Sequence, residues 1–253
     1  QKVVKLSVNA GLSCPNRDGK KSTGGCTYCS ASLSGDFSQS ADISITNQLY
    51  MQKEILKKKW GECLYIPYFQ AGSNTYAPLE TLKKMYSEAL SFENTVGISI
   101  ATRADCVDTE IADYLKKLSE STYLTVELGL QSIHDKTACS INRCHTYQDF
   151  FDTYRLLKER NINICVHIIN GLPGESIEMM MQTAREISKL KPHSVKIHML
   201  HIIKNTALAK EYEALPFNLL TLEEYIEKIL ISDVSDVVSL IIPSSISFLV
   251  KEL

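Results

Sequence analysis

The feature of this sequence that most restricts its fold is a regular alternation of short apolar runs with longer amphipathic stretches. The apolar runs are bounded by polar or turn residues and are rich in β-branched and aromatic side chains, which is typical of buried strands. They are Val3–Val8, Leu64–Phe69, Val96–Ala101, Tyr123–Leu128, Ile162–Ile169 and Val195–Leu200. Patterns of helical period follow them, at Thr46–Lys59, Leu79–Ser91, Asp108–Leu118, Tyr147–Arg160, Ile177–Leu190 and Leu222–Ile231.

Strands that alternate with helices form a parallel sheet with right-handed crossovers. Six such units predict an α/β fold, a partial (β/α)6 barrel of the TIM type. In such barrels the loops at the carboxyl ends of the strands carry the chemistry. A doubly wound open sheet is the alternative, but no Gly-x-Gly-x-x-Gly turn follows any of the runs, which disfavours dinucleotide binding.

The length of 253 residues suits one barrel domain. We expect this domain to cover residues 1–231, with residues 232–253 as a C-terminal segment. The tail from Val237 to Leu253 is apolar and poorly patterned. The chain starts with Gln1 and not with Met, and we expect both ends to be truncated.

Charge and hydropathy restrict the partners. The chain has 27 basic and 29 acidic residues, a net charge of −2, so bulk charge does not indicate a nucleic-acid partner, although a local basic patch would suffice. No run approaches the roughly 20 apolar residues that cross a bilayer, and the first residues do not form a signal peptide. We therefore expect a cytoplasmic protein with no membrane partner.

Eight cysteines in a chain from a reducing compartment indicate metal or redox chemistry before disulfides. Cys14, Cys26 and Cys29 are clustered after the first predicted strand with the spacing C-x11-C-x2-C, whereas Cys165 lies in an apolar run and is predicted to be core. A zinc site would need a fourth ligand, which is not close in sequence, and a disulfide would leave one thiol unpaired. A [4Fe–4S] cluster would use three thiolates and leave one iron open. The spacing alone leaves both the cluster and zinc open.

Further short motifs accompany the cysteines, in order along the chain. They are Cys-Pro-Asn-Arg-Asp-Gly at 14–19, Gly-Gly-Cys-Thr-Tyr-Cys at 24–29, Asn-Thr-Tyr-Ala-Pro at 74–78, Glu-Leu-Gly-Leu-Gln-Ser at 127–132, Ile-Asn-Arg at 141–143, His-Thr at 145–146, Gly-Leu-Pro-Gly-Glu at 171–175 and Lys-Ile-His at 196–198. Together they resemble the radical S-adenosylmethionine (SAM) superfamily, in a bacterial branch related to the catalytic subunit of Elongator. The resemblance covers residues 3 to about 231.

The resemblance implies that Cys14, Cys26 and Cys29 hold a [4Fe–4S] cluster whose open iron is chelated by SAM. An electron from the cluster would cleave SAM to methionine and a 5′-deoxyadenosyl radical, which abstracts a hydrogen atom from the substrate. A low-potential donor of the flavodoxin or ferredoxin type would supply the electron. Such a radical attacks almost any nearby C–H bond, so a dry pocket inside the barrel is required.

The resemblance also implies cofactor contacts, residue by residue. Tyr28 would lie against the adenine, Arg143 would pair with the SAM carboxylate, and His167 would lie near the ribose hydroxyls. The backbone of residues 70–74 would receive the SAM amino group. The cofactor-contact positions are Tyr28, Gln70, Ala71, Gly72, Ser73, Asn74, Thr102, Gln131, Arg143 and His167.

Further polar residues are expected to line the site or face the substrate: Arg103, Glu127, His145 and His198. Glu127 lies in an apolar run and would be costly if buried alone, so we expect it to face the barrel mouth or to pair with Arg103 or Arg143. For His198 a substrate contact, a metal contact and simple exposure all stay open. Tyr65 and Tyr68 are interpreted as barrel core.

The chain also departs from the pattern of its relatives. They usually have an aromatic residue and Thr in place of Gly72 and Ser73, proline in place of Ala104, and glycine in place of Cys144. We expect the last two changes to loosen loops at the site without abolishing the chemistry.

Kinship implies a tRNA substrate, modified at the side chain of the wobble uridine, with Arg17, Lys20, Lys21 and Arg103 as candidates for phosphate contacts. Nothing after Ile231 resembles an acetyltransferase, so carboxymethylation that depends on acetyl-CoA is not expected. Two alternatives remain, because fold kinship does not fix a substrate. One is a radical SAM enzyme that acts on a small molecule such as a porphyrin-like acid, and the other is a non-catalytic zinc-binding module.

Overall fold

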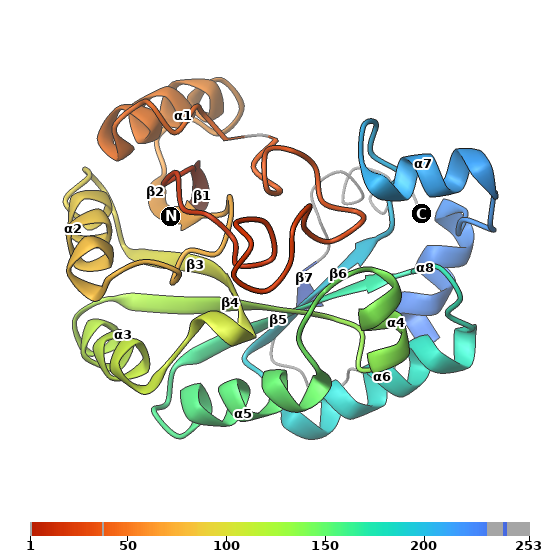
Figure 1. Cartoon of the computed structure of the whole chain (residues 1–253). Coiled ribbons are helices and arrows are strands. Elements are labelled where there is room, and N and C mark those ends of the chain that lie inside the picture. Colours follow the sequence, from red (N-terminus) through yellow and green to blue (C-terminus); the bar gives the residue numbers. More distant parts are fainter. Residues whose placement is uncertain (1, 37, 232–239, 242–253) are drawn as a thin grey trace.

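The predicted strands form one parallel sheet that curls into a partial barrel (Figure 1). The computed structural model describes residues 2–36, 38–231 and 240–241. The strands are β1 (Val3–Val8), β2 (Leu64–Phe69), β3 (Gly97–Arg103), β4 (Tyr123–Gln131), β5 (Asn163–Asn170), β6 (Ser194–Met199) and β7 (Leu240–Ile241). Neighbours in sequence are neighbours in the sheet, in the order β1-β2-β3-β4-β5-β6-β7. The predicted α/β partial barrel is confirmed.

Helices connect the strands and cover the outer face of the arc (Figure 1). The predicted ones are α1 (Ile45–Trp60), α2 (Leu79–Leu90), α3 (Thr109–Ser121), α5 (Tyr147–Lys158), α6 (Ile177–Leu190) and α8 (Leu222–Ile231). Polar N-cap side chains start most of them by accepting the N–H three residues on; these caps are Ser44, Asp108, Thr146 and Ser176. The 3₁₀ helix η1 (Ala104–Cys106) and the helices α4 (Asp135–Ser140) and α7 (Ala207–Ala214) were not predicted, because they are too short to show a period.

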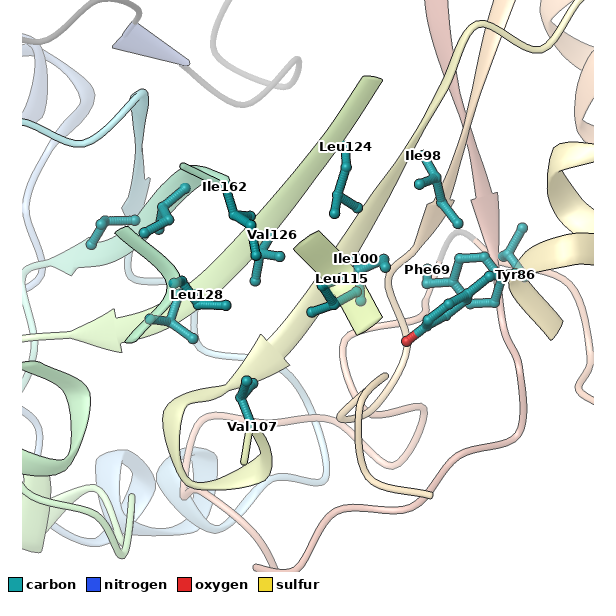
Figure 2. Close-up of a cluster of buried hydrophobic side chains, with 14 of the residues drawn as sticks. Phe69, Tyr86, Ile98, Ile100, Val107, Leu115, Leu124, Val126, Leu128 and Ile162 are labelled. Atoms are coloured by element: carbon teal, nitrogen blue, oxygen red, sulfur yellow. The ribbon is translucent and has the colours of Figure 1, made fainter. Parts of the chain in front are cut away.

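Alternation along the strands separates the core from the site. On β4, Leu124, Val126 and Leu128 are buried in the main hydrophobic cluster, which Figure 2 shows around them. Glu127 and Gly129 point to the other face and line a cavity inside the arc. Because side chains of a strand alternate between faces, one strand both packs against helices and supplies polar groups to the interior.

The central strands run further than their apolar runs suggested. β3 reaches Arg103 and β4 reaches Gln131, and the added residues keep parallel pairing, with Arg103 opposite Gly129. Between Gly129 and Gln131 the register against β5 shifts, and Gln131 has φ of +63°. Polar strand ends are therefore held in the sheet at its carboxyl edge.

The long segment between β1 and α1 contains no helix or named strand in its described residues, 9–36 and 38–44. An isolated antiparallel bridge joins Asp18 to Thr23. Figure 1 shows this segment, in red, inside the arc of the sheet. The predicted cluster loop after the first strand thus lies where the barrel would otherwise be open.

Most of the C-terminal segment 232–253 lies outside the described residues. Leu240 and Ile241 add to the sheet edge opposite Val195 and Lys196 of β6. The domain boundary at residue 231 stays a prediction. Within the described part of the chain, no helix has the length and apolar character needed to span a membrane.

Candidate active site

Three thiols from the segment between β1 and α1 face one cavity. Cys14, Cys26 and Cys29 line a cavity of about 350 Å³ at the carboxyl edge of the sheet. The N–H of Arg17 donates to the Cys14 carbonyl (2.8 Å), and the N–H of Cys29 donates to the Cys26 carbonyl (2.9 Å). These turns aim the three side chains inward. The remaining cysteines, all in the described part of the chain, do not line this cavity.

Polar groups lie close to the cavity thiols. Asn16 Nδ2 lies 3.6 Å from Cys26 Sγ, and Ser34 Oγ lies 3.8 Å from Cys29 Sγ. Such polar neighbours tune sulfur ligands in clusters. The donor set therefore suits a [4Fe–4S] cluster with three protein thiolates.

The cluster thiols lie in a shielded environment. Burial raises the pKa of the Cys26 and Cys29 thiols, and the charges of Arg103 and Arg17 partly oppose this rise. Metal binding needs thiolates, so loading of the site releases protons.

Arg17 stabilises the cluster loop itself. Its guanidinium donates to the carbonyls of Cys29 (2.9 Å), Ser30 (2.5 Å) and Ala31 (3.3 Å). These bonds use Nη1 and Nη2, whereas Nε has no partner among the described residues. The expectation that Arg17 contacts nucleic-acid phosphates stays a prediction.

Most of the predicted site residues meet in the same cavity as the thiols. Those that line it are Tyr28, Gln70, Gly72, Ser73, Thr102, Arg103, Glu127, Gln131, His145, His167 and His198. Ala71, Asn74 and Arg143 do not line it and are buried behind its wall. The cofactor contacts assigned to individual residues stay predictions.

Asn74 fixes the loop that follows β2. Its Nδ2 donates to the carbonyls of Phe69 (3.1 Å) and Ala101 (3.0 Å), which tie β2 to β3. Tyr86 on α2 donates its hydroxyl to the Asn74 carbonyl. Gly72 in the same loop has φ of +81°. A Cβ there would collide with the carbonyl of Leu12, which lies in the segment between β1 and α1 that carries the three thiols (the cluster segment). The loop is therefore preset against the cluster segment.

Arg143 is buried and is bonded to backbone carbonyls. Its Nε donates to the His145 carbonyl (3.0 Å) and its Nη1 to the Ser132 carbonyl (2.7 Å). Its Nη2 has no hydrogen-bond partner among the described residues and lies 3.8 Å from Asp135. Arg143 thus holds the loop after β4, a role that the sequence did not indicate, and the predicted pairing with the SAM carboxylate rests on that remaining donor.

Arg103 lines the cavity as half of an ion pair. Its Nε and Nη2 donate to the two carboxylate oxygens of Asp105, both at 2.8 Å, and Nη2 also donates to the Arg143 carbonyl (2.9 Å). Burial would raise the pKa of Asp105, but the hydrogen bonds from Arg103 outweigh it and lower that pKa. Arg103 is therefore charged and paired.

Glu127 is paired, although with lysine and histidine and not with arginine as expected. Lys5 donates to Oε1, Ser99 donates to Oε1 at 2.6 Å, and His167 Nε2 lies 2.6 Å from Oε2. Lys196 Nζ stands 3.9 Å from Oε2. Burial opposes ionisation, but the hydrogen bond from His167 and the charges of Lys5 and Lys196 hold the pKa of Glu127 well below its usual value. Of the two alternatives expected for Glu127, it faces the cavity. The arginine partner was wrong, because Lys5 reaches the carboxylate across the arc.

His167 and His198 continue the polar chain from this carboxylate, with their ring planes tilted by 49°. Their ring centroids lie 5.2 Å apart, and His198 Nε2 lies 3.4 Å from His167 Nδ1. Burial lowers the pKa of both rings. If His167 donates Nε2–H to Glu127, its Nδ1 accepts from His198, so both rings serve as neutral hydrogen-bonding groups on the cavity wall.

The sequence did not single out all of the lining residues. Tyr68, interpreted as core, lines the cavity beneath Lys5 and Lys196, whose Nζ atoms lie 4.8 and 5.3 Å from its ring centroid. Lys196 and His201 also line the cavity. A charged residue inside an apolar run was the available signal for Lys196, as it was for Glu127. Tyr65 is buried in the core, as interpreted.

Glu127, Cys165 and His167 could also be considered as a metal site, because one ligand atom from each lies within 4.8 Å of the others. The carboxylate, however, already accepts from Lys5, Ser99 and His167, and ammonium groups beside it compete with a metal cation. Cys165 is fully buried, as predicted for a core residue.

Cys144 stands where relatives usually have glycine, and its backbone has a conformation that suits glycine. Its φ is +60°, in the left-handed region that glycine adopts at low cost. Its thiol lies 3.2 Å from Asn142 Oδ1, and Asn142 Nδ2 donates to the Gly25 carbonyl (2.8 Å) of the cluster loop. The cysteine is accommodated in a glycine conformation beside that loop.

Comparison with known families decides the class of this site. The profile of the Radical SAM superfamily matches residues 17–187, and that of the Radical_SAM C-terminal domain matches residues 192–235. The chain belongs to the radical SAM superfamily. Its members use a [4Fe–4S] cluster and SAM, the cofactors that the three cavity thiols fit.

Radical SAM relatives of this chain extend across bacteria and archaea. YtqA of Bacillus subtilis (strain 168) is 43% identical over 226 residues, which cover 89% of this chain and 70% of YtqA. YhcC of Escherichia coli (strain K12) is 39% identical over 226 residues, 89% of this chain and 72% of YhcC. The tRNA uridine(34) acetyltransferase of Methanocaldococcus infernus is 33% identical over 138 residues, 53% of this chain and 25% of that enzyme.

Two solved proteins share the fold. The archaeal Elp3 of Methanocaldococcus infernus has a TM-score of 0.68 at 21% identity and covers 99% of this chain, which spans 62% of the Elp3 chain. Coproporphyrinogen III oxidase (HemN) of Escherichia coli has a TM-score of 0.58 at 14% identity, covering 99% of this chain and 53% of its own. The chain thus spans less than two thirds of either solved protein.

Proposed function

We propose that this radical SAM protein cleaves SAM reductively at a cluster held by Cys14, Cys26 and Cys29, and that it modifies the side chain of a tRNA wobble uridine. The convergence of these three thiols on one cavity carries the radical chemistry. The tRNA substrate is supported by kinship, through the similarity to the tRNA uridine(34) acetyltransferase. A reductant of the flavodoxin or ferredoxin type is the proposed electron donor.

The bound cofactors would supply the electron and the radical, and the protein would orient and shield them. Tyr28 lines the cavity, and burial raises the pKa of its hydroxyl well above the usual value, so this hydroxyl stays protonated and can donate a hydrogen bond. An apolar wall limits water in the cavity; it comprises Leu33, Ile169, Met199, Leu200 and Ile203. Thr102 and Gln131, at the ends of β3 and β4, provide polar groups to orient SAM.

The radical chemistry is tested with protein reconstituted anaerobically. We expect about four irons and four sulfides per chain, and 5′-deoxyadenosine on addition of dithionite and SAM. Alanine at Cys14, Cys26 or Cys29 should remove both cluster and cleavage. Cys139→Ala is the matched control because this thiol is exposed on α4 and does not line the cavity. One zinc per chain, with no SAM cleavage, would contradict the proposal.

The tRNA substrate is tested by nucleoside analysis. Wobble uridines from cells with and without the gene are compared by mass spectrometry, with the Cys26→Ala variant as a complementation control. We expect a change confined to the uridine side chain, restored by wild type alone. An unchanged profile, together with no tRNA binding by purified protein, would argue against tRNA.

A specific observation supports a small acid as the second candidate substrate. Arg17 and Arg103 are committed to loop carbonyls and to Asp105, and Lys21 Nζ lies 3.1 Å from Asp105, so the basic groups near the cavity are largely paired. A porphyrin-like acid would not need a phosphate-binding rim. Substrate-dependent 5′-deoxyadenosine formation, with tRNA or with the acid, separates the two.

A further inference from the structure

The inner part of the cavity contains unequal charges. The ammonium groups of Lys5 and Lys196 both approach the single carboxylate of Glu127. Lys5 does not line the cavity and pairs directly with Oε1, whereas Lys196 lines the cavity and stays 3.9 Å from Oε2. One positive charge of this group is therefore left without a carboxylate of its own.

Lys196 is the member of the group that a ligand can reach. Its side chain is 17% exposed, and its Nζ donates no hydrogen bond to another residue in the described part of the chain. Glu127 has little capacity left, because Lys5, Ser99 and His167 bind its two oxygens. A cationic ligand would find the carboxylate occupied, while an anionic one would find an ammonium with free donors.

Other charged groups on the cavity wall are already satisfied. Arg103 is paired with Asp105. Asp36 keeps its negative charge, but the hydroxyls of Ser30 and Ser32 hold its carboxylate within the cluster segment, and it forms no ion pair with Lys196. Burial lowers the pKa of His167 and His198, so these rings are neutral near pH 7 and add no charge. The excess positive charge therefore stays at Lys196.

We propose that the inner part of the cavity is a subsite for a carboxylate group of the substrate, bound by Lys196 with His198 and His201 beside it. The inference rests on the proposed radical SAM function and deepens it by naming the charge of the substrate. One uncompensated ammonium matches one carboxylate, whereas a phosphate monoester would bring a charge of about −1.5 to −2 at pH 7. Pairing restores neutrality where burial makes an unpaired charge costly.

Acid and amide pairs test this subsite, because replacement of a carboxylate by a carboxamide removes the charge at nearly constant shape. One pair is an anticodon stem-loop with 5-carboxymethyluridine or 5-carbamoylmethyluridine at the wobble position. The other is coproporphyrin III or its tetra-amide. Affinities are measured for reconstituted protein with SAM bound, as wild type, as Lys196→Met and as Lys189→Met. Lys189 is the matched control because it lies on α6, paired with Glu186 and outside the cavity.

We expect wild type to bind the acid of one pair at least about tenfold more tightly than its amide, the loss typical of a charged hydrogen bond. Lys196→Met should abolish this preference, and its loss of acid affinity should exceed any loss of SAM affinity by about tenfold. Lys189→Met should keep the preference. The pair that shows it identifies the source of the carboxylate as RNA or small molecule.

Three results would overturn the subsite. The first is equal binding of acid and amide by wild type, and the second is binding of neither acid. The third is a loss of SAM affinity in Lys196→Met as large as its loss of acid affinity, because this would assign Lys196 to the SAM carboxylate. Should Lys196→Met fail to fold, the comparison in wild type decides alone. Failure of SAM cleavage would instead reject the proposed function, so the two failures are distinguishable.

Discussion

At the scale of single residues, Glu127 shows how an open barrel tolerates a buried charge. Its side chain is fully buried, yet its carboxylate accepts from groups on three other strands, Lys5 of β1, Ser99 of β3 and His167 of β5. The ionised carboxylate is stabilised in this buried position because strands on both sides of β4 supply its hydrogen-bond donors. The polar interior of the cavity is therefore built around one residue.

Removal of that charge should be costly. Glu127→Gln would leave Lys5 and Lys196 without their shared counter-charge, and we expect a loss of about 3–5 kcal/mol in the free energy of unfolding, typical of a broken buried pair. The double variant Glu127→Gln with Lys5→Met should recover part of this loss. Urea unfolding of the four proteins in this double-mutant cycle gives the coupling energy. A cost below about 1 kcal/mol for Glu127→Gln would show that the network contributes little to stability.

His145 should make stability depend on pH. Burial, together with the charges of Arg143 and Arg103, lowers the pKa of His145 to about 3. In the unfolded chain His145 binds its proton near pH 6.5. The contribution of the neutral buried ring to the free energy of unfolding is therefore complete above that pH and is lost progressively as pH falls, by about 2 kcal/mol at pH 5.

His145→Asn should therefore flatten the fall in stability between pH 7 and pH 5. Urea unfolding at several pH values measures this slope, and His193→Asn, at a partly exposed ring beside Tyr123, is the control. An unchanged slope in His145→Asn would mean that His145 has the same pKa in the folded and unfolded chains, so that burial does not lower it. The remaining slope belongs in part to His167 and His198, whose pKa values burial also lowers.

At the scale of elements, periodicity was sufficient for the strands and long helices. β1 and β2 begin and end at the predicted residues, because their apolar and β-branched runs are bounded by polar or turn residues. β3 and β4 run further than predicted because Thr102, Arg103 and Gln131 are polar and still pair in the sheet. The local pattern of apolar residues indicates which face of a strand is buried. It does not indicate how far the strand continues by pairing with its neighbours in the sheet.

The site was predictable to the extent that it follows strand ends. Thr102, Gln131 and His167 line the cavity because each is at or near the carboxyl end of its strand. The pairing of Lys5 with Glu127, 122 residues apart, depends on how far the sheet curls, which no local pattern encodes. The burial of Arg143 against carbonyls was equally invisible, because its partners are backbone atoms.

The cluster segment should depend on its cofactor for order. Residues 9–36 and 38–44 hold few regular backbone hydrogen bonds, in contrast to the paired strands β2 to β5. Removal of iron with a chelator under anaerobic conditions should therefore raise amide hydrogen exchange in this segment at least tenfold, the effect of losing about 1.4 kcal/mol of local stability. Exchange in β4 should change little. A uniform rise across the sheet would indicate that the cluster supports the whole fold.

At the scale of the whole molecule, the balance of charge bears on the kind of substrate. The net charge is −2, and around the cavity the basic groups are drawn into the structure. Arg17 binds carbonyls of the cluster loop, and Arg103 and Lys21 share Asp105. A nucleic-acid substrate would therefore rely on few phosphate contacts near the site, and its affinity should depend only moderately on salt.

Lys20 and Lys21 should differ in how much each contributes to the salt dependence of tRNA binding, although they are adjacent. Lys20 is exposed, with its Nζ 5.3 Å from the centroid of the Tyr76 ring, whereas Lys21 Nζ already lies 3.1 Å from Asp105. If tRNA docks over the cluster loop, Lys20→Ala should reduce the slope of log affinity against log salt by about one phosphate contact. Lys21→Ala should reduce it by less, because a phosphate must compete with the carboxylate. Filter binding of tRNA at four salt concentrations measures both slopes, with Lys189→Ala on the outer face as control. Equal slopes for Lys20→Ala and wild type would place the tRNA elsewhere on the surface.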